Sequence, residues 1–222
     1  MEKHIFFSEG KLGILVVLSL ALFLTACGQD NKKPVSKQTT QEKISKIEKS
    51  EPDDSVLVAY FSLADGMPDR ADAVSCATPI RGNTKTAAEE VARQTGGTLF
   101  VITTEKEYPV SHEDCSEVAE KEQKADERPK LSSHIPDMEK YKTVYLGFPI
   151  WWYQEPMVVR SFLEEYDFSD KSIFPFCTTL GADIGSSVDN IKSICPKSVV
   201  GEGIALPTES RDFSKEIAEW LQ

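Results

Sequence analysis

Short apolar runs alternate with amphipathic helical stretches over residues 55–222, and this alternation limits the folds open to the chain. Largely apolar runs are typical of strands buried on both faces, as in parallel sheets covered by helices. We therefore predict an α/β domain with a doubly wound, five-stranded parallel sheet and helices on both faces. The five runs cover residues 56–61, 98–103, 143–148, 172–178 and 198–206.

Helical periodicity fills the gaps between these runs. Apolar stripes are centred on Val91 and Phe162, Gly96-Gly97 stops the first of them, and a last stripe begins at Phe213. Residues 111–128 also look helical but carry many charges, so we expect that helix to be largely solvated. Pro175 conflicts with its apolar run, because proline has no N–H for a sheet ladder; we expect a bulge or a missing hydrogen bond there.

Length and charge narrow the functional classes. The 222 residues suit one ordinary domain with extensions. Residues 55–222 contain 28 acidic and 17 basic residues, which accounts for the whole net charge of −11. A nucleic acid is therefore a poor partner, because phosphate backbones are bound by basic surfaces.

The amino terminus has the features of a secretory signal. A basic start precedes the apolar run 12–24, which as a helix spans about 20 Å, less than the roughly 30 Å of a bilayer core. The run ends in Leu24-Thr25-Ala26-Cys27, which resembles the lipobox of bacterial lipoproteins. That resemblance implies a signal peptide over 1–26 and a lipidated Cys27 that holds the protein at the extracytoplasmic face of the cell membrane. An ordinary signal peptide or a short anchor is the alternative.

A polar segment separates this signal from the domain. Residues 27–54 consist of Cys27 followed mainly by Lys, Gln, Ser, Thr and Glu. Such a stretch cannot bury enough apolar surface to offset the entropy lost on ordering. We interpret it as a disordered tether whose ends lie roughly 30 Å apart, and we place the folded domain at 55–222.

A ligand site is expected where the loops after the first, third and fourth strands meet, past the carboxyl ends of the strands. The first loop contains Ser62, and Gly82-Asn83-Thr84 opens the next helix. Glycine, small hydroxyls and free backbone N–H groups at a helix start suit a phosphate, although an ordinary helix cap is the alternative. The loop 149–156 contains two tryptophans and a tyrosine, which can cover a flat ring; core packing is the alternative for either tryptophan. The third loop, 178–186, is rich in glycine and hydroxyls.

Together these segments resemble the flavodoxin-like family, in particular its type 4 group, over nearly all of residues 55–222. The resemblance implies the strand order 2-1-3-4-5 and a non-covalently bound FMN. The matching segments are Val58–Ser62, Gly82–Thr84, Thr95–Phe100, Leu146–Trp152, Phe162–Asp167 and Pro175–Thr178.

The same resemblance implies the cofactor-binding residues. The phosphate would be held by Ser62, Gly82, Asn83 and Thr84. One side of the isoalloxazine would contact Pro149, Ile150, Trp151, Trp152 and Tyr153, and the other side Thr178, Thr179, Leu180 and Gly181. No residue is assigned as catalytic.

The sequence departs from the flavodoxin pattern in two places. Nineteen residues, Leu63 to Arg81, separate Ser62 from Gly82, whereas flavodoxins join these segments almost directly. The loop between Pro149 and Pro156 also lacks the glycine whose peptide flips towards the reduced flavin. A non-glycine residue with positive φ costs roughly 1–2 kcal/mol, and this favours two-electron over one-electron chemistry.

Cysteine and histidine spacings indicate no metal or Cys-x-x-Cys site. Cys76, Cys115, Cys177 and Cys195 leave the disulfide pairing open. Cys76 and Cys177 are one pair that can meet near the site. His112 and His134 are expected at the surface.

The sequence therefore predicts an FMN-binding redox protein outside the cytoplasm. It would either pass electrons to a partner protein or act as an FMN-dependent oxidoreductase of the quinone-reductase type on a quinone-like small molecule. The alternative is a flavodoxin-fold binding or scaffold lipoprotein that no longer binds flavin.

Overall fold

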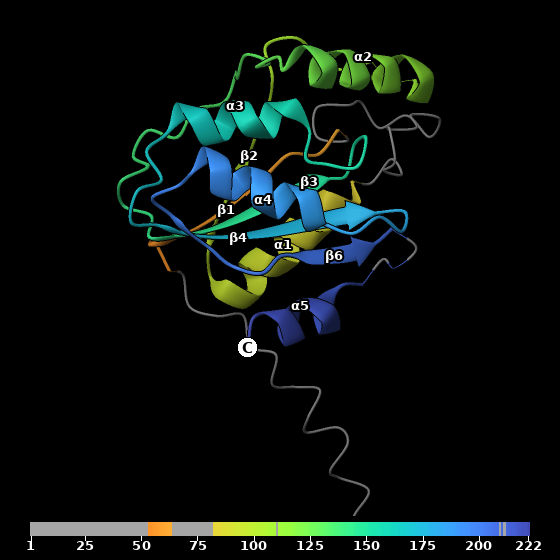
Figure 1. The fold of residues 1–222 in the computed structure, drawn as a ribbon. Helices are drawn as coiled ribbons and strands as arrows, with labels where there is room; N and C mark the ends of the chain where they lie inside the picture. Colours follow the sequence, from red (N-terminus) through yellow and green to blue (C-terminus); the bar gives the residue numbers. More distant parts are fainter. Residues whose placement is uncertain (1–52, 64–81, 110, 209, 211) are drawn as a thin grey trace, which may run out of the picture. The chain divides into compact units, whose positions relative to one another are not determined.

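Parallel strands rich in β-branched and aromatic residues build one central sheet (Figure 1). The computed structural model describes residues 53–63, 82–109, 111–208, 210 and 212–222, all within the unit 47–222. The predicted signal peptide, lipidated Cys27, tether and insertion lie outside these residues, apart from 53–54 and Leu63. The strands are β1 (Val56–Tyr60), β2 (Thr98–Val101), β3 (Thr143–Pro149), β4 (Ser172–Thr179), β5 (Val199–Val200) and β6 (Ile204–Pro207).

The strand order is β2-β1-β3-β4-β5, with β6 also beside β4, and every pair is parallel. This confirms the predicted 2-1-3-4-5 sheet. The helices are α1 (Asn83–Thr95), α2 (His112–Ala125), α3 (Met157–Glu165), α4 (Gly185–Ile194) and α5 (Ser214–Trp220).

The fifth predicted strand is in fact two short strands. Ile173 of β4 pairs with Val200 of β5, and Phe176 of β4 pairs with Ile204 of β6. Between these two pairs β4 advances by three residues and the neighbouring chain by four. The extra residue is a bulge opposite Pro175, which keeps its pairing with Leu146 of β3 on the other side. The interrupted pairing agrees with the expectation of a bulge or a missing hydrogen bond at this proline.

Helices cover both faces of the sheet, as predicted (Figure 1). Alternate residues of β1 point to opposite faces: Leu57 belongs to one core layer and Val58 to the other. The first layer includes Phe162 of α3 and Ile191 of α4, and the second layer joins α1 to Ile217 of α5. The domain therefore has two separate hydrophobic cores, one on each face of the sheet.

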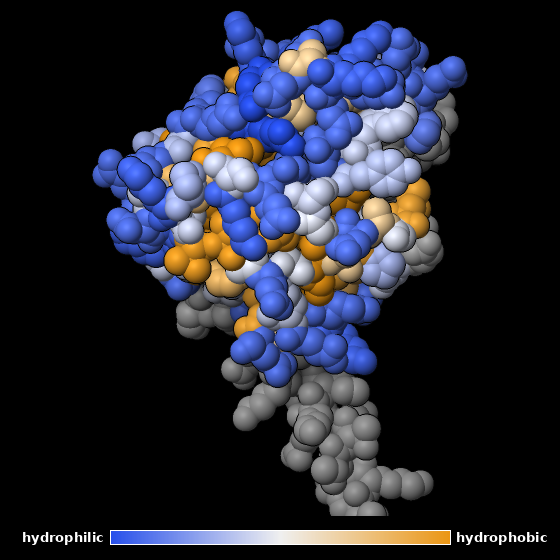
Figure 2. All heavy atoms as spheres, in the orientation of Figure 1, coloured by the Kyte–Doolittle hydropathy of each residue, from blue (hydrophilic) through white to orange (hydrophobic). Residues whose placement is uncertain are grey.

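Helix ends follow local sequence signals. Gly96 ends α1 with φ 74°, and its N–H donates to the Ala92 carbonyl over 2.8 Å, as the Gly96-Gly97 stop predicts. Ser111 caps α2 by accepting from the Asp114 N–H at 3.1 Å. As expected, α2 is mostly exposed, and Figure 2 shows hydrophilic residues dominating the region where this helix lies.

Two observations complete the fold. Helix α4, between β4 and β5, was not predicted, although Ile184, Val188 and Ile191 recur at helical spacing and pack in the first core layer. Over the described residues, no helix has the length and apolar character needed to cross a bilayer. The apolar run 12–24 lies outside those residues.

Candidate functional site

Thr178 lies near the end of β4. It contacts both the segment predicted to hold the phosphate, residues 82–84, and the loop predicted to contact the flavin ring, residues 149–156, which we call the ring loop. Its Oγ1 lies 2.7 Å from Oγ1 of Thr84 in the first turn of α1. Its carbonyl accepts from the Ile150 N–H at 3.1 Å, directly after β3. The three loops therefore meet at one residue at the carboxyl edge of the sheet, where ligands of open α/β sheets bind.

The start of α1 is arranged for an anion. Gly82 precedes the helix with φ 58°, a left-handed conformation that suits glycine. Gly82, the N-cap residue, has no side chain to cap the helix, and the first turn itself contains no acidic residue, so the positive end of the helix dipole is not offset from within this turn. Asn83 and Thr84 are buried, and the Asn83 amide donates to the Thr208 carbonyl at 3.0 Å.

The ring loop is a tight two-residue turn. Trp151 and Gln154 exchange two backbone hydrogen bonds, of 2.9 and 3.1 Å. Between them Trp152 and Tyr153 adopt φ 46° and 68°, the positive pair of a type I′ turn. The loop thus takes left-handed backbone conformations without glycine, and neighbouring helices must stabilise it.

Helices α2 and α4 hold this turn. The Trp152 indole N–H donates to the Ser116 carbonyl at 3.0 Å, and the Gln123 amide donates to the Trp152 carbonyl at 3.2 Å. The Ser186 hydroxyl donates to the Tyr153 carbonyl at 2.7 Å. Both carbonyls of the turn are therefore already hydrogen-bonded.

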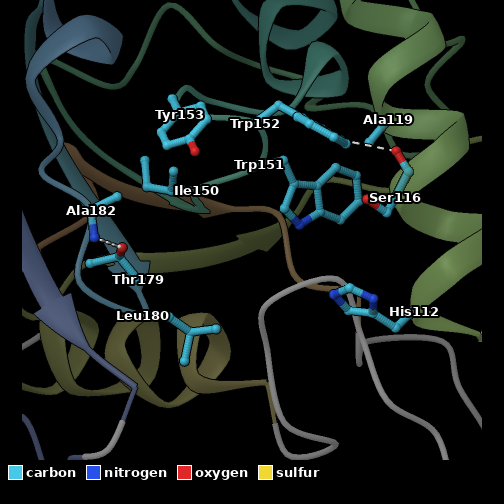
Figure 3. Close-up of a pocket in the computed structure, with 10 residues that line it drawn as sticks. All are labelled: His112, Ser116, Ala119, Ile150, Trp151, Trp152, Tyr153, Thr179, Leu180 and Ala182. Atoms are coloured by element: carbon cyan, nitrogen blue, oxygen red, sulfur yellow. Dashed lines mark hydrogen bonds between the residues drawn. The ribbon is translucent and has the colours of Figure 1, made fainter.

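A cavity of about 370 Å³ opens between these loops and α2 (Figure 3). This volume lies within the range of small-molecule sites. The lining residues differ in exposure: Trp151 is 4% exposed and lies at the buried side, whereas Tyr153 and Leu180 are 81% and 66% exposed. The cavity is lined by His112, Ser116, Ala119, Ile150, Trp151, Trp152, Tyr153, Thr179, Leu180 and Ala182.

The structure brings together six of the predicted site residues around this cavity, from Ile150 to Tyr153 and from Thr179 to Leu180. The others lie at its edges, on the same side of the sheet: Pro149 ends β3, Thr178 is the junction already described, and Gly181 follows with φ 121°. Ser62 and the segment 82–84 lie at the phosphate side, outside the cavity lining. Their contacts with a cofactor remain predictions.

Four lining residues were missed by sequence reasoning. His112, Ser116 and Ala119 come from α2, and Ala182 follows Gly181. His112 is exposed, as expected, but it also faces the cavity mouth (Figure 3). The i, i+4, i+7 spacing of Cys115, Ala119 and Glu122, the buried residues of α2, is the sequence signal that could have placed one face of this charged helix against the site.

Three buried side-chain polar atoms lack hydrogen-bond partners in the described part of the chain: Ser62 Oγ, Trp151 Nε1 and Ser187 Oγ. Buried polar groups are rarely left unpaired. Two of the three belong to predicted cofactor-binding residues, one at the phosphate side and one at the ring side.

An aromatic cluster and a buried acid lie behind Trp151. Its ring packs edge-on against Phe61 and Tyr108, with centroids 5.3 and 5.1 Å away. The Tyr108 hydroxyl donates to Glu122 Oε2 at 2.9 Å. Burial raises the pKa of Glu122 to about 6, although the Tyr108 hydrogen bond acts in the opposite direction.

The cysteines correct one expectation. Cys177 is a free, buried thiol whose pKa burial raises to about 12, so it does not pair with Cys76. Cys195 is also free, whereas Cys115 of α2 is disulfide-bonded. Cys76 itself lies outside the described residues.

Comparisons with known proteins agree with this geometry. A family model described as Flavodoxin matches residues 55–222. Candidate flavoproteins from Bacteroides uniformis and Bacteroides eggerthii, both crystal structures, share 28% and 27% identity with TM-scores of 0.59 and 0.58. Each comparison covers 76% of this chain, and 97% and 96% of the respective relative.

A flavoprotein from Lactobacillus acidophilus, solved in complex with FMN, has 16% identity and a TM-score of 0.56, over 77% of this chain and 100% of that one. At this identity the likeness shows the fold. No curated protein matches the sequence. Because the family model spans most of the chain and the sheet has the expected order, the chain belongs to the flavodoxin family.

Proposed function

We propose that residues 55–222 bind FMN non-covalently and form a redox protein tethered outside the cytoplasmic membrane by lipidated Cys27. FMN is supported by family membership and by the FMN complex of the Lactobacillus acidophilus relative. When bound, FMN supplies the electron transfer, and the protein supplies binding, orientation and electrostatics.

The observation that carries this proposal is the junction at Thr178. Its two hydrogen bonds hold the start of α1 and the turn after β3 close enough for one FMN to reach both. The Ser62 hydroxyl, unpaired among the described residues, and the glycine-started first turn of α1 suit the phosphate, while the cavity beside Trp152 and Tyr153 suits the ring. These residues therefore fit the cofactor.

We further propose that the protein favours two-electron transfer, as in a quinone reductase. In a one-electron flavodoxin, the ring loop supplies a backbone carbonyl that turns towards the reduced ring. Here the carbonyls of Trp152 and Tyr153 already accept from Gln123 and Ser186, so turning either one breaks a hydrogen bond. The exposed apolar rim of Tyr153 and Leu180 suits a flat, quinone-like acceptor.

The extracytoplasmic location rests on the lipobox and gains support from the disulfide at Cys115. Disulfides persist in oxidising compartments and are rare in the cytosol.

The test is to titrate a purified fragment of residues 47–222 with FMN and follow the quenching of flavin fluorescence. This fragment is the compact unit that contains the whole described fold. We expect Ser62→Ala to weaken FMN binding by roughly 10- to 150-fold, since a hydrogen bond to a charged group contributes about 1.5–3 kcal/mol.

Riboflavin, which lacks the phosphate, is the matched ligand control: Ser62→Ala should leave its affinity unchanged. Ser193→Ala is the control variant, because the Ser193 hydroxyl only donates to the Asp189 carbonyl within α4. A wild-type fragment that takes up no FMN would contradict the proposal and favour the scaffold function.

A further inference from the structure

The three tryptophans of the chain differ in what their indole N–H groups do. The Trp152 N–H donates to the Ser116 carbonyl, and the Trp220 N–H donates to the Glu202 carbonyl at 3.1 Å. The Trp151 N–H is buried and has no acceptor within the described residues. Since an unmet buried donor costs about 1–3 kcal/mol, this group requires an explanation.

The Trp151 side chain is not free to turn towards another acceptor. Its ring is wedged between Phe61 and Tyr108, at interplanar angles of 88° and 81°. Tyr108 is fixed in turn by its hydrogen bond to Glu122. The Trp151 backbone is fixed as well, by the two hydrogen bonds to Gln154. The direction of the N–H bond is therefore set by the fold.

The nitrogen edge of the ring is buried but turned towards the residues that line the cavity (Figure 3). In Figure 3 the six-membered ring of Trp151 extends towards α2, and its nitrogen lies on the opposite edge, towards the middle of the residues that line the cavity. Only 4% of the residue is exposed, so neither face of the ring is open for stacking on a ligand. Trp151 thus offers an N–H edge, and not a face, to a ligand.

We propose that Trp151 donates its indole hydrogen bond to the heteroaromatic ring of the bound ligand. The acceptor is a carbonyl oxygen or an unprotonated ring nitrogen, and, resting on the proposed function, the ligand is the isoalloxazine of FMN. Stacking on the ring then belongs to the exposed Trp152 and Tyr153. This assigns the two adjacent tryptophans different roles, one as a hydrogen-bond donor that selects the ligand and one as a cover.

Nuclear magnetic resonance of the ¹⁵N-labelled fragment 47–222 tests the proposal directly. Its spectrum contains three indole N–H signals, and the Trp151→Phe spectrum identifies the one that belongs to Trp151. On addition of FMN we expect this signal to move downfield and its exchange with solvent to slow, because the proton enters a hydrogen bond in the plane of the ring. Riboflavin should give the same changes, since it carries the same ring.

Affinity provides the second measurement. Trp151→Phe should weaken the binding of FMN and of riboflavin alike, by about 10-fold, as expected for a lost buried hydrogen bond. Ser62→Ala, in contrast, should affect FMN alone. Trp220→Phe is the matched control, because its indole bonds within the protein away from the cavity, and it should leave both affinities unchanged.

Each outcome decides between the claims. If FMN binds but the Trp151 signal stays in place, or moves upfield as for a ring stacked on the flavin, the donor role is wrong and the FMN-binding function stands. If no flavin binds to the folded wild-type fragment, the proposed function itself is wrong.

Discussion

At the scale of single residues, the unusual feature around the site is a carboxyl group kept out of water. Glu122 is 9% exposed on the inward face of α2, and burial raises its pKa to about 6. It accepts from Tyr108, whose own pKa is raised by burial and by the neighbouring Glu122. The pair supports Trp151 from behind, so its ionisation bears on the geometry of the cavity.

The contribution of Glu122 to the free energy of unfolding should fall as the pH rises from about 4.5 to about 6. In this window the folded state holds the Glu122 proton more tightly than the unfolded state, so deprotonation opposes folding. The loss is on the order of 2 kcal/mol, at 1.36 kcal/mol for each pKa unit.

Glu122→Gln removes this titration. We compare the free energy of unfolding of Glu122→Gln with that of wild type at two pH values. The difference, variant minus wild type, should be about 2 kcal/mol larger above pH 6 than at pH 4. Urea unfolding at both pH values measures the effect. Glu117→Gln, in the exposed ion pair with Lys121 on the same helix, is the control. Parallel pH profiles for wild type and Glu122→Gln would rule out the role of Glu122.

At the scale of elements, the turn 151–154 depends on three helices. Glu155 follows it and is fully buried; its carboxylate accepts from Arg160 of α3 at 2.8 Å and from Asn190 of α4 at 3.2 Å. Together with the bonds from α2 and α4 to the turn, this contact offsets the cost of two left-handed aromatic residues. The turn is therefore set before any ligand arrives.

Glu155→Ala should lower the free energy of unfolding by up to about 3–5 kcal/mol, because it removes the buried partner of Arg160 and leaves this charge only its longer ion pair with the exposed Asp126, at 3.6 Å. Chemical denaturation gives the value. The matched control is Glu165→Ala, which removes an exposed pair with His134 and should cost no more than about 1 kcal/mol. Equal losses in the two variants would mean that Glu155 does not hold the turn.

The elements also show where sequence patterns suffice. The runs around Val58 and Leu146 predict buried strands correctly, because a strand covered by helices on both faces is apolar along nearly its whole length. Helix α4 was missed because residues 178–186 were interpreted as a loop rich in glycine, although Ile184, Val188 and Ile191 follow helical spacing and pack against the core. The split between β5 and β6 depends on a bulge, which follows from pairing with Pro175 and not from local periodicity.

The site was predicted where it depends on chain topology and missed where it depends on packing. In a parallel sheet of this order, the carboxyl ends of β1, β3 and β4 lie side by side. The contacts among Thr84, Ile150 and Thr178 therefore follow from the strand order and not from the course of the loops. The spacing of Cys115, Ala119 and Glu122 indicates an inward face of α2, but which residues beside that face reach the turn depends on how the helix packs, and His112 and Ser116 were missed for that reason.

At the scale of the whole molecule, the folded domain is one part of a chain whose first 54 residues serve, by our proposal, to place it. Within the described domain Cys115 is disulfide-bonded, whereas Cys177 and Cys195 are buried free thiols; by our proposal, Cys27 carries the lipid. Two acyl chains on Cys27 would anchor the protein stably, and the tether would keep the cavity near the membrane surface.

Cys27→Ser should therefore move the full-length protein from the membrane to the soluble phase in a bacterial host. Without the thiol there is no acyl chain, and the run 12–24 is too short to span a bilayer. Detergent phase partition measures the change, and mass spectrometry of the wild type should show an acylated amino-terminal cysteine. Cys195→Ser, which alters a buried thiol of the domain, is the control and should stay in the detergent phase. If Cys27→Ser also stayed there, the run 12–24 would be the anchor and the lipidation proposal would be wrong.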